Sequence, residues 1–251
     1  MRAMVLAAGL GTRLRPLTND RPKALVEING RTLLEVTLTR LRSFGVGEVI
    51  VNAHHFAEQI VDHLKAHDNF GMRVEISLEE VLLDTGGGLK KAAHFFLDSG
   101  EPFLLHNVDV MSNIDLRRMV EYHRRHDALA TLAVQERASS RQLLFDDDGR
   151  LCGRKAEGED AEMVGAARQG HPLAFCGIHV ISPRIFPLLT EEGAFPLVPA
   201  YLRLAGQGEK LVAFRADEYS WRDLGTVESL RQAAREVRLD TGAQGSGVRS
   251  G

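Results

Sequence analysis

The sequence predicts an α/β protein with a Rossmann-like, doubly wound and mainly parallel sheet, followed by an appended mixed or antiparallel sheet. Apolar runs typical of strands alternate with segments of helical periodicity through the first half. From residue 128 onward, shorter apolar runs are separated by turn residues instead. A length of 251 residues with a hydrophobic content of 44% suffices for one substantial core. We therefore expect one domain over 1–240, built from halves 1–126 and 127–240, and a flexible tail over 241–251.

The first half shows a regular β-α-β-α order. Leu34, Leu38 and Leu41 fall at the spacing of one helix face. The segment Ser112–Asp115 supplies residues typical of a helix start, with Ser112 and Asp115 as capping candidates. The expected strands cover 4–8, 48–52, 73–77 and 102–107, and the expected helices cover 32–44, 56–66, 89–96 and a segment ending near 126. This order predicts parallel strands joined by crossover helices.

The sequence of the second half predicts short strands joined by turns. Turn residues at 146–150 separate two short apolar runs, which indicates a hairpin. The expected strands cover 130–134, 143–145, 151–152, 175–181, 210–214 and 221–224, and the expected helices cover 186–189 and 227–239. We expect these strands to form the appended antiparallel or mixed sheet.

The loop after the first strand has the composition of a phosphate-binding loop. Gly9 and Gly11 let backbone amides approach an anion closely, and Arg13, Arg15 and Lys23 add positive charge. The spacing fits neither the Walker loop nor the dinucleotide fingerprint. The alternative is an ordinary strand-to-helix turn with surface arginines. The arrangement favours a nucleoside triphosphate as ligand.

Two acids follow strand-like runs at their carboxyl ends. Asp109 follows the strand ending at residue 107, and Asp223 lies in Trp221–Thr226, where an apolar run stops before a glycine. Open α/β sheets bind ligands at that edge. The alternative is a turn or capping carboxylate, although Ser112 and Asp115 are better placed to cap the following helix. Two carboxylates completed by phosphate oxygens and water suit Mg²⁺.

A second glycine-rich segment runs from Asp84 to Leu89. Its three consecutive glycines are expected to precede a helix, and free amides at a helix N-terminus can receive a ribose, a base edge or a phosphate. The alternative is a flexible turn.

These segments resemble one known family. Residues 6–18 (LAAGLGTRLRPLT), followed by RPKAL at 21–25, resemble the signature of the sugar-1-phosphate nucleotidyltransferases. Asn107-Val108-Asp109 and Trp221–Thr226 are similar to that family's two metal-binding motifs. The resemblance covers nearly residues 1–238 and implies a GT-A-like nucleotidyltransferase fold. It implies a nucleotide-binding half over 1–126 and a sugar-phosphate-binding half over 127–240.

The resemblance also implies residue roles. Arg13 and Lys23 are the expected catalytic cations, and Asp109 and Asp223 the expected Mg²⁺ ligands. The expected nucleotide-binding residues are Leu6, Ala7, Ala8, Gly9, Gly11, Thr12, Glu79, Thr85, Gly86 and Gly87. The expected sugar-phosphate-binding residues are Asn107, Gly177 and Thr226.

The implied reaction transfers a nucleotidyl group from a nucleoside triphosphate to a sugar 1-phosphate, with release of pyrophosphate. The layout is similar to that of short bacterial N-acetylmuramate-1-phosphate uridylyltransferases, which favours UTP and N-acetylmuramate 1-phosphate or a similar hexose 1-phosphate. Glu79 would accept a hydrogen bond from uracil N3–H, but it could equally accept two from guanine. The alternatives are a mannose- or heptose-1-phosphate guanylyltransferase using GTP, and a catalytically silent nucleotide-sugar sensor.

Composition excludes several other classes. A net charge of −3 argues against a nucleic-acid partner, and no apolar run approaches the ~20 residues of a membrane span. Two cysteines imply no disulfide framework, and we find no pattern of a signal peptide. We expect a cytoplasmic protein that is a monomer or a homodimer.

Overall fold

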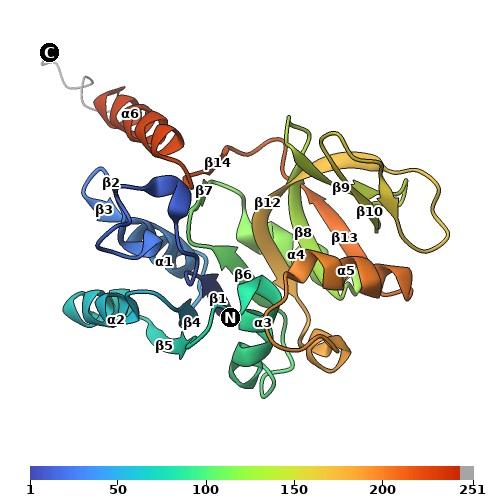
Figure 1. The fold of residues 1–251 in the computed structure, drawn as a ribbon, viewed down its shortest axis with the longest axis horizontal. Coiled ribbons are helices and arrows are strands. Elements are labelled where there is room, and N and C mark those ends of the chain that lie inside the picture. The colour runs from blue at the N-terminus through green and yellow to red at the C-terminus, as the bar shows by residue number, and fades with distance from the viewer. Residues whose placement is uncertain (244–251) are drawn as a thin grey trace, which may run out of the picture.

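The fold is organised around four parallel strands of the first half (Figure 1). The computed structural model describes residues 1–243. The strands are β1 (Arg2–Leu6), β4 (Glu48–Ala53), β5 (Arg73–Leu78) and β6 (Phe103–Asn107). Their spatial order is β6-β1-β4-β5, and each neighbouring pair is parallel. The prediction of a parallel sheet is confirmed, with each strand shifted by one or two residues from its expected bounds.

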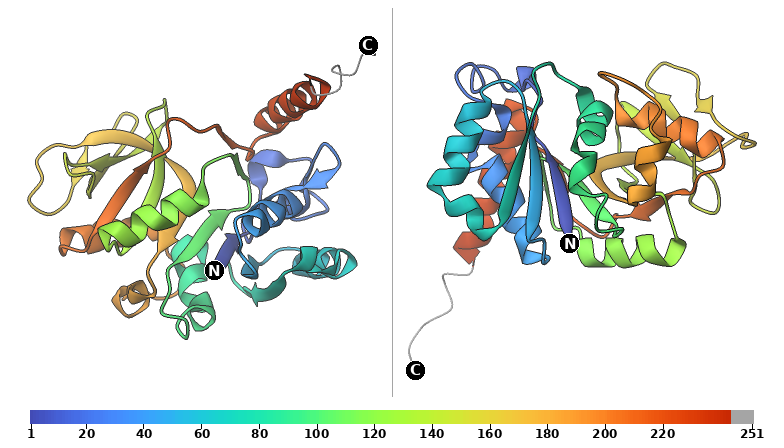
Figure 2. Two further views of the ribbon diagram at one scale, coloured as in Figure 1. Left: turned by 180° about the vertical axis from the view of Figure 1, so that it is seen from behind. Right: turned by 90° about the horizontal axis from the view of Figure 1, so that it is seen from below.

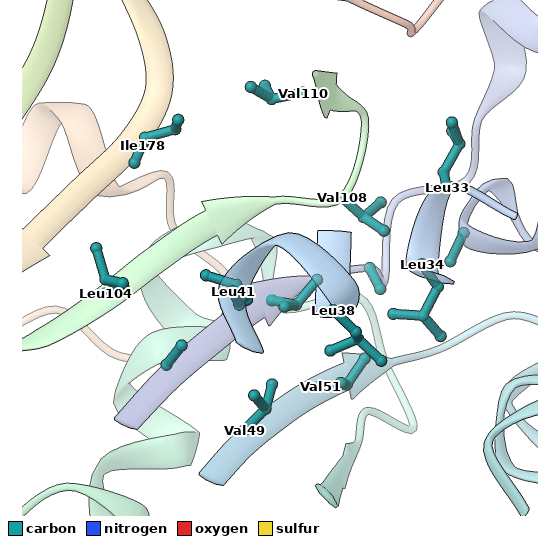
Figure 3. Close-up of a cluster of buried hydrophobic side chains, with 14 of the residues drawn as sticks. Leu33, Leu34, Leu38, Leu41, Val49, Val51, Leu104, Val108, Val110 and Ile178 are labelled. Carbon is teal, nitrogen blue, oxygen red and sulfur yellow. The ribbon is translucent and has the colours of Figure 1, made fainter. Parts of the chain in front are cut away.

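Helices cover both faces of this sheet (Figure 2). They are α1 (Leu33–Ser43), α2 (Ala57–Ala66), α3 (Asp84–Lys91) and α4 (Leu116–His126). Successive strand residues face opposite sides, so Val5 packs in the core under α1 while its neighbour Met4 packs in the core under α3. Figure 3 shows Leu38 and Leu41 of α1 lying over the strands of the sheet. The alternation explains why each strand is apolar at nearly every position.

The second half extends the same sheet. Its strands are β8 (Ala130–Gln135), β9 (Arg141–Phe145), β10 (Leu151–Ala156), β11 (Glu162–Met163), β12 (His171–Ile181) and β13 (Leu211–Arg215). β12 pairs antiparallel with β6, β8 and β9, whereas β13 runs parallel to β8. The expected mixed sheet is therefore present, joined edge to edge with the first to give ten strands. The 146–150 hairpin is confirmed, since β9 and β10 pair antiparallel across it.

A two-stranded ribbon connects the two halves away from the main sheet. β7 (Val110–Ser112) pairs antiparallel with β14 (Trp221–Asp223). Ser112 therefore belongs to a strand, and its expected capping role is wrong. Asp115 alone caps α4, because its carboxylate accepts hydrogen bonds from the amides of Arg117 and Arg118.

Several expected bounds are corrected. The three glycines at 86–88 lie inside α3 and do not precede it, and residues 92–95 continue as a 3₁₀ helix. Residues 183–188 also form a 3₁₀ helix, and α5 (Leu197–Gly206) was not expected. α6 runs from Val227 to Ala243, so residues 241–243 of the expected tail are helical. Residues 244–251 lie outside the described residues.

Smaller elements complete the first half. A hairpin of β2 (Glu27–Ile28) and β3 (Arg31–Thr32) leads into α1, and Thr32 caps that helix by accepting from the amide of Glu35 at 3.0 Å. Within the described residues, no helix has the length and apolar character needed to cross a membrane.

Candidate active site

A large cavity lies where the strand order reverses. β4 and β5 extend from one side of β1, whereas the chain returns to place β6 on the other side. Leu6 ends β1 and Asn107 ends β6. These two residues are register partners, and both line the cavity. Ligands of open α/β sheets bind at such a reversal, beyond the carboxyl ends of the strands. The cavity has a volume of about 610 Å³, and both halves of the chain contribute to its wall.

Asp109 and Asp223 converge within this cavity. Asp223 ends β14 opposite Val110, and the amide of Leu224 donates to the carbonyl of Asp109 at 2.8 Å. A Cβ placed on Gly225 would lie 3.0 Å from Asp109 Oδ2 and 2.7 Å from Asp223 Oδ1. Arg13 Nη2 would lie 2.8 Å from the same Cβ. The two carboxylates and this guanidinium therefore border one small space that a glycine keeps open.

This cradle fits a hard divalent cation. Carboxylate oxygens are the protein ligands that Mg²⁺ prefers, and it typically retains water or binds substrate phosphates at its other positions. Within the described residues, no group of three or more histidine, cysteine, aspartate or glutamate side chains could hold a metal. Any metal here would therefore take most of its ligands from substrate and water.

A cation stands beside each carboxylate. Lys23 begins a short 3₁₀ helix (Lys23–Leu25), and its Nζ donates to Asp109 Oδ2. Arg13 Nη2 lies 3.9 Å from Asp223 Oδ2. The Lys23 side chain is 16% exposed, whereas that of Arg13 is 63% exposed. The expected pair of cations and the expected pair of acids are thus brought together, with Lys23 held and Arg13 free to follow a ligand.

The first loop is fixed by a residue that sequence reasoning missed. Asn52, at the carboxyl end of β4, accepts from the amides of Ala7 at 2.7 Å and Ala8 at 3.3 Å. The amides of Ala7 and Ala8 are therefore already occupied within the protein, which leaves their expected contact with a nucleotide to their other atoms. Ala8 and Gly9 still line the cavity, whereas Ala7 is buried outside its wall. No hydrogen bond among residues 1–243 engages the amide of Gly9, which leaves it open to a ligand.

Gly11 and Thr12 lie outside the cavity wall. Gly11 has φ of +63°, and a Cβ there would lie 3.0 Å from side-chain carbons of both Lys23 and Thr18. Thr12 begins a 3₁₀ helix. Gly11 therefore turns the loop and makes room for Lys23, in place of the expected direct approach to a nucleotide.

Glu79 lies beneath the cavity and does not line it. The residue is 2% exposed, and its carboxylate accepts from Asn52 Nδ2 at 2.8 Å and from the amide of Leu83 at 2.9 Å. Both oxygens already have protein donors, so the structure favours a supporting role for Glu79 over its expected contact with the base. The side chain orients Asn52, and through it the first loop.

The glycines of α3 also serve packing. The amides of Gly86 and Gly87 donate to the carbonyl of Phe195 at 2.9 and 3.2 Å. A Cβ on Gly86 would lie 2.3 Å from the Phe195 ring, and one on Gly87 would lie 2.4 Å from the carbonyl oxygen of Gly193. Neither glycine lines the cavity, so their expected nucleotide contact is corrected. Thr85 does line it, and its hydroxyl also accepts from the amide of Leu197.

Of the three residues expected to bind the sugar phosphate, two line the cavity and one does not. Asn107 and Gly177 both line the cavity, and a Cβ on Gly177 would lie 2.8 Å from Asn107 Nδ2. Gly177 has φ of +71°. Thr226 lies outside the wall, where its hydroxyl accepts from the amide of Ser229 at 3.1 Å. Thr226 therefore caps the start of α6, and its expected contact with the sugar phosphate is corrected.

The wall formed by the second half contains further polar residues that sequence reasoning missed. They are Arg137, Ser139, Arg141 and Trp221. Asn52 could have been found by the rule that selected Asp109, because it too is polar at the end of a buried parallel strand. Arg137 lies in the loop between β8 and β9, and Arg141 begins β9, so neither ends a buried parallel strand of the first half.

The chain matches the family model described as Nucleotidyl transferase over residues 2–143. It is 37% identical to N-acetylmuramate alpha-1-phosphate uridylyltransferase of Caulobacter vibrioides, over 94% of this chain and 96% of that relative. It is 28% identical to mannose-1-phosphate guanyltransferase of Candida albicans, over 90% of this chain and 61% of that relative. The crystal structure of HddC from Yersinia pseudotuberculosis superposes with a TM-score of 0.76 at 23% identity, over 94% of this chain and 99% of that one, which shows the shared fold.

These likenesses agree with the cavity at the strand reversal, its paired carboxylates and its paired cations. They favour an enzyme over a silent sensor, because the relatives that match nearly the whole chain carry the names of transferases. The chain belongs to the nucleotidyl transferase family and is a sugar-1-phosphate nucleotidyltransferase.

Proposed function

We propose that the enzyme transfers a uridylyl group from UTP to N-acetylmuramate 1-phosphate, releasing pyrophosphate. The observation that carries the chemistry is the cradle of Asp109 and Asp223 with Lys23 and Arg13 beside it. The choice of substrates is supported by the relative from Caulobacter vibrioides, which matches this chain almost from end to end.

The reaction needs alignment more than proton transfer. A sugar 1-phosphate is already largely dianionic near neutral pH, since its second pKa is about 6. One of its oxygens attacks the α-phosphorus of UTP, and the bond from that phosphorus to the oxygen bridging to the β-phosphate breaks. The electron pair leaves with pyrophosphate. No covalent enzyme intermediate or general base is required.

The cations manage the charge of this transfer. Lys23 is held at Asp109 and would balance charge on the transferred phosphoryl group. Arg13 is exposed and would follow the β- and γ-phosphates as they depart. Asp109 and Asp223 would hold Mg²⁺, which when bound supplies charge neutralisation to phosphate oxygens.

The remaining contacts position the nucleotide. The free amide of Gly9 suits a phosphate oxygen, while Leu6, Leu82 and Thr85 line the nucleotide side of the cavity. Asn52 holds the first loop in shape, so the loop is ordered before the triphosphate arrives. Transfer from GTP to mannose 1-phosphate remains the second candidate, because a mannose-1-phosphate guanyltransferase also aligns with 90% of the chain.

Pyrophosphate release tests the proposal. The purified enzyme is incubated with each of UTP, GTP, dTTP and CTP against N-acetylmuramate, N-acetylglucosamine, glucose and mannose 1-phosphates, with Mg²⁺ or with a chelator. We expect the highest kcat/KM for UTP with N-acetylmuramate 1-phosphate, and loss of activity on chelation. A preference for GTP with mannose 1-phosphate would favour the second candidate. Full activity under chelation would contradict the proposed metal.

The proposed substrates also suggest the compartment. UTP is a cytoplasmic metabolite, and the two cysteines, Cys152 and Cys176, are free and buried. We therefore propose that the enzyme acts in the cytoplasm.

A further inference from the structure

The wall of the cavity that the second half forms, here called the sugar side, contains two arginines, Arg137 and Arg141. The reaction proposed above gives neither of them a role. Arg137 and Ser139 lie in the loop between β8 and β9, and Arg141 begins β9. Arg13 and Lys23 each face a carboxylate. No ion pair joins Arg137 or Arg141 to a carboxylate among the described side chains, although both line the same cavity. The sugar side therefore carries positive charge that the protein itself does not neutralise.

Arg137 is held rigidly in this position. Its guanidinium carbon lies 3.9 Å from the centre of the Trp221 ring, and its Nη2 donates to the carbonyl of Phe175 at 2.9 Å. Trp221 is itself fixed, because its Nε1 donates to the carbonyl of Cys176 at 2.7 Å. Stacking and a backbone bond hold the planar fork in one orientation before any ligand arrives.

One donor of Arg137 has no partner. Its Nε is buried and makes no hydrogen bond among the described residues. A buried donor without an acceptor is costly. The protein therefore leaves the hydrogen bonding of Arg137 incomplete. The Ser139 hydroxyl donates to the carbonyl of Arg141 at 2.8 Å, which ties the turn between the two arginines.

The distance from Arg137 to the reacting centre follows from the positions of Trp221 and Asp223 on β14. Trp221 and Asp223 are two residues apart on β14, so their side chains point to the same face of the ribbon, and both line the cavity. Two residues along a strand span roughly 7 Å. A phosphate near Asp223 and an anion near Arg137 would then be separated by about the width of one sugar ring.

We propose that Arg137 and Arg141 form a carboxylate subsite, and that the sugar substrate is an acidic sugar 1-phosphate bearing a carboxylate away from its anomeric carbon. This inference rests on the proposed function for the reaction itself. The planar guanidinium fork matches a carboxylate in two parallel hydrogen bonds. The 1-phosphate would lie at the reacting centre, beside the cation held by Asp109 and Asp223. A second anion on the substrate would then lie near Arg137 and Arg141.

The test compares two sugars that differ in one group. N-acetylmuramate 1-phosphate carries a carboxylate on its lactyl ether, and N-acetylglucosamine 1-phosphate lacks that ether. We measure kcat/KM for both with UTP in wild type, Arg137→Gln and Arg141→Gln, with Arg124→Gln as a matched control. Arg124 is an exposed arginine of α4 that does not line the cavity.

We expect the ratio of kcat/KM for acidic over neutral sugar to fall about tenfold or more in each cavity variant, mainly through KM, since a charged hydrogen bond is lost. The ratio should not change in Arg124→Gln. Equal losses on both sugars would assign the arginines to the 1-phosphate and overturn the subsite. An unchanged ratio without any loss would overturn it as well.

A binding measurement separates this inference from the proposed function. Trp221 is the only tryptophan of the chain, so its fluorescence reports the ring on which Arg137 stacks. Titration of wild type with each sugar phosphate, without nucleotide, should give tighter binding for the acidic sugar, and Arg137→Gln should abolish the difference. If wild type released no pyrophosphate with any substrate, the proposed function would fail while this titration still decided the subsite. Equal affinities of wild type for both sugars would overturn the subsite alone.

Discussion

Asp109 and Asp223 show how much of the site depends on single oxygen atoms. They come from distant parts of the chain, yet one oxygen of each lies within 3.0 Å of the same point above Gly225. Any side chain at residue 225 would occupy that point. Arg13 Nη2 also lies 2.8 Å from it. The absence of a side chain at residue 225 therefore defines this space together with the two carboxylates and the guanidinium.

Replacement of either acid tests the proposed metal site. Asp109→Asn and Asp223→Asn keep the shape of the side chain but remove its charge. We expect turnover to fall by orders of magnitude, because metal-based charge stabilisation is worth several kcal/mol. Circular dichroism and thermal melting serve as controls for folding. Near-normal kcat in either folded variant would remove that residue from the metal site.

Glu79→Gln distinguishes a supporting role from base recognition. The amide can accept from only one of the two donors that Glu79 now serves, Asn52 Nδ2 and the Leu83 amide. We expect a loss of roughly 1–3 kcal/mol in unfolding free energy and a higher KM for every nucleotide. The ratio of kcat/KM for UTP over GTP should stay constant. A changed ratio would restore the base-reading role.

The sequence predicted those site residues whose chemistry follows from strand ends. Asp109, Asp223, Arg13 and Lys23 lie beside loops that leave the sheet at its ligand-binding edge, and the structure brings them together. Glu79 could not be placed, because its partners Asn52 and Leu83 are determined by tertiary packing. Arg137 was missed because its stacking partner, Trp221, is distant in the sequence.

At the scale of elements, α3 explains why a run of glycines was misinterpreted. A glycine run normally predicts a turn, since glycine is unfavourable in a helix by roughly 1 kcal/mol relative to alanine. Here the helix packs so closely against residues 193–195 that no side chain fits at 86 or 87. Close packing therefore overrides helix propensity. The strands were easier to predict, because alternating burial on both faces leaves nearly continuous apolar runs.

Gly87→Ala tests this packing. Alanine would favour the helix by propensity but places a Cβ 2.4 Å from the Gly193 carbonyl oxygen. We expect net destabilisation of roughly 1–3 kcal/mol, measured by urea unfolding. Gly47→Ala is the matched control, because nothing lies within 4 Å of a Cβ there and its φ is not positive. A stabilised Gly87→Ala variant would show that the 193–195 segment yields easily.

The molecule as a whole buries histidines between its layers. Burial lowers the pKa of His123 to about 4 and that of His179 to about 3. His123 hydrogen-bonds with the Thr131 hydroxyl at 2.9 Å, and His179 with the Tyr201 hydroxyl at 3.0 Å. Both therefore fold as neutral side chains that join α4 and α5 to the sheet.

These groups predict acid sensitivity. Unfolded histidine titrates near pH 6.5, so below that pH the unfolded state binds more protons than the folded state. The contribution of these two neutral histidines to the unfolding free energy is fully present above pH 6.5 and is lost as the pH falls toward their folded pKa values. We expect each histidine to remove on the order of 2 kcal/mol of unfolding free energy between pH 7 and pH 5.

Denaturant unfolding at several pH values checks this dependence. In His179→Asn, an amide replaces the imidazole and does not titrate. The slope of unfolding free energy against pH between 5 and 6.5 should become shallower than in wild type, whatever the variant's absolute stability. An unchanged slope would mean that His179 does not contribute to the acid sensitivity.

The ribbon of β7 and β14 has a consequence for protein synthesis. It joins residue 110, made early, to residue 223, made after the last strand of the main sheet. A nascent chain can thus form the parallel sheet and order its first loop while the second carboxylate has yet to emerge from the ribosome. Such a chain has only one of the two acids, so catalytic competence comes late, once β14 has closed on β7. An enzyme assembled in this order would not become active before its second half exists.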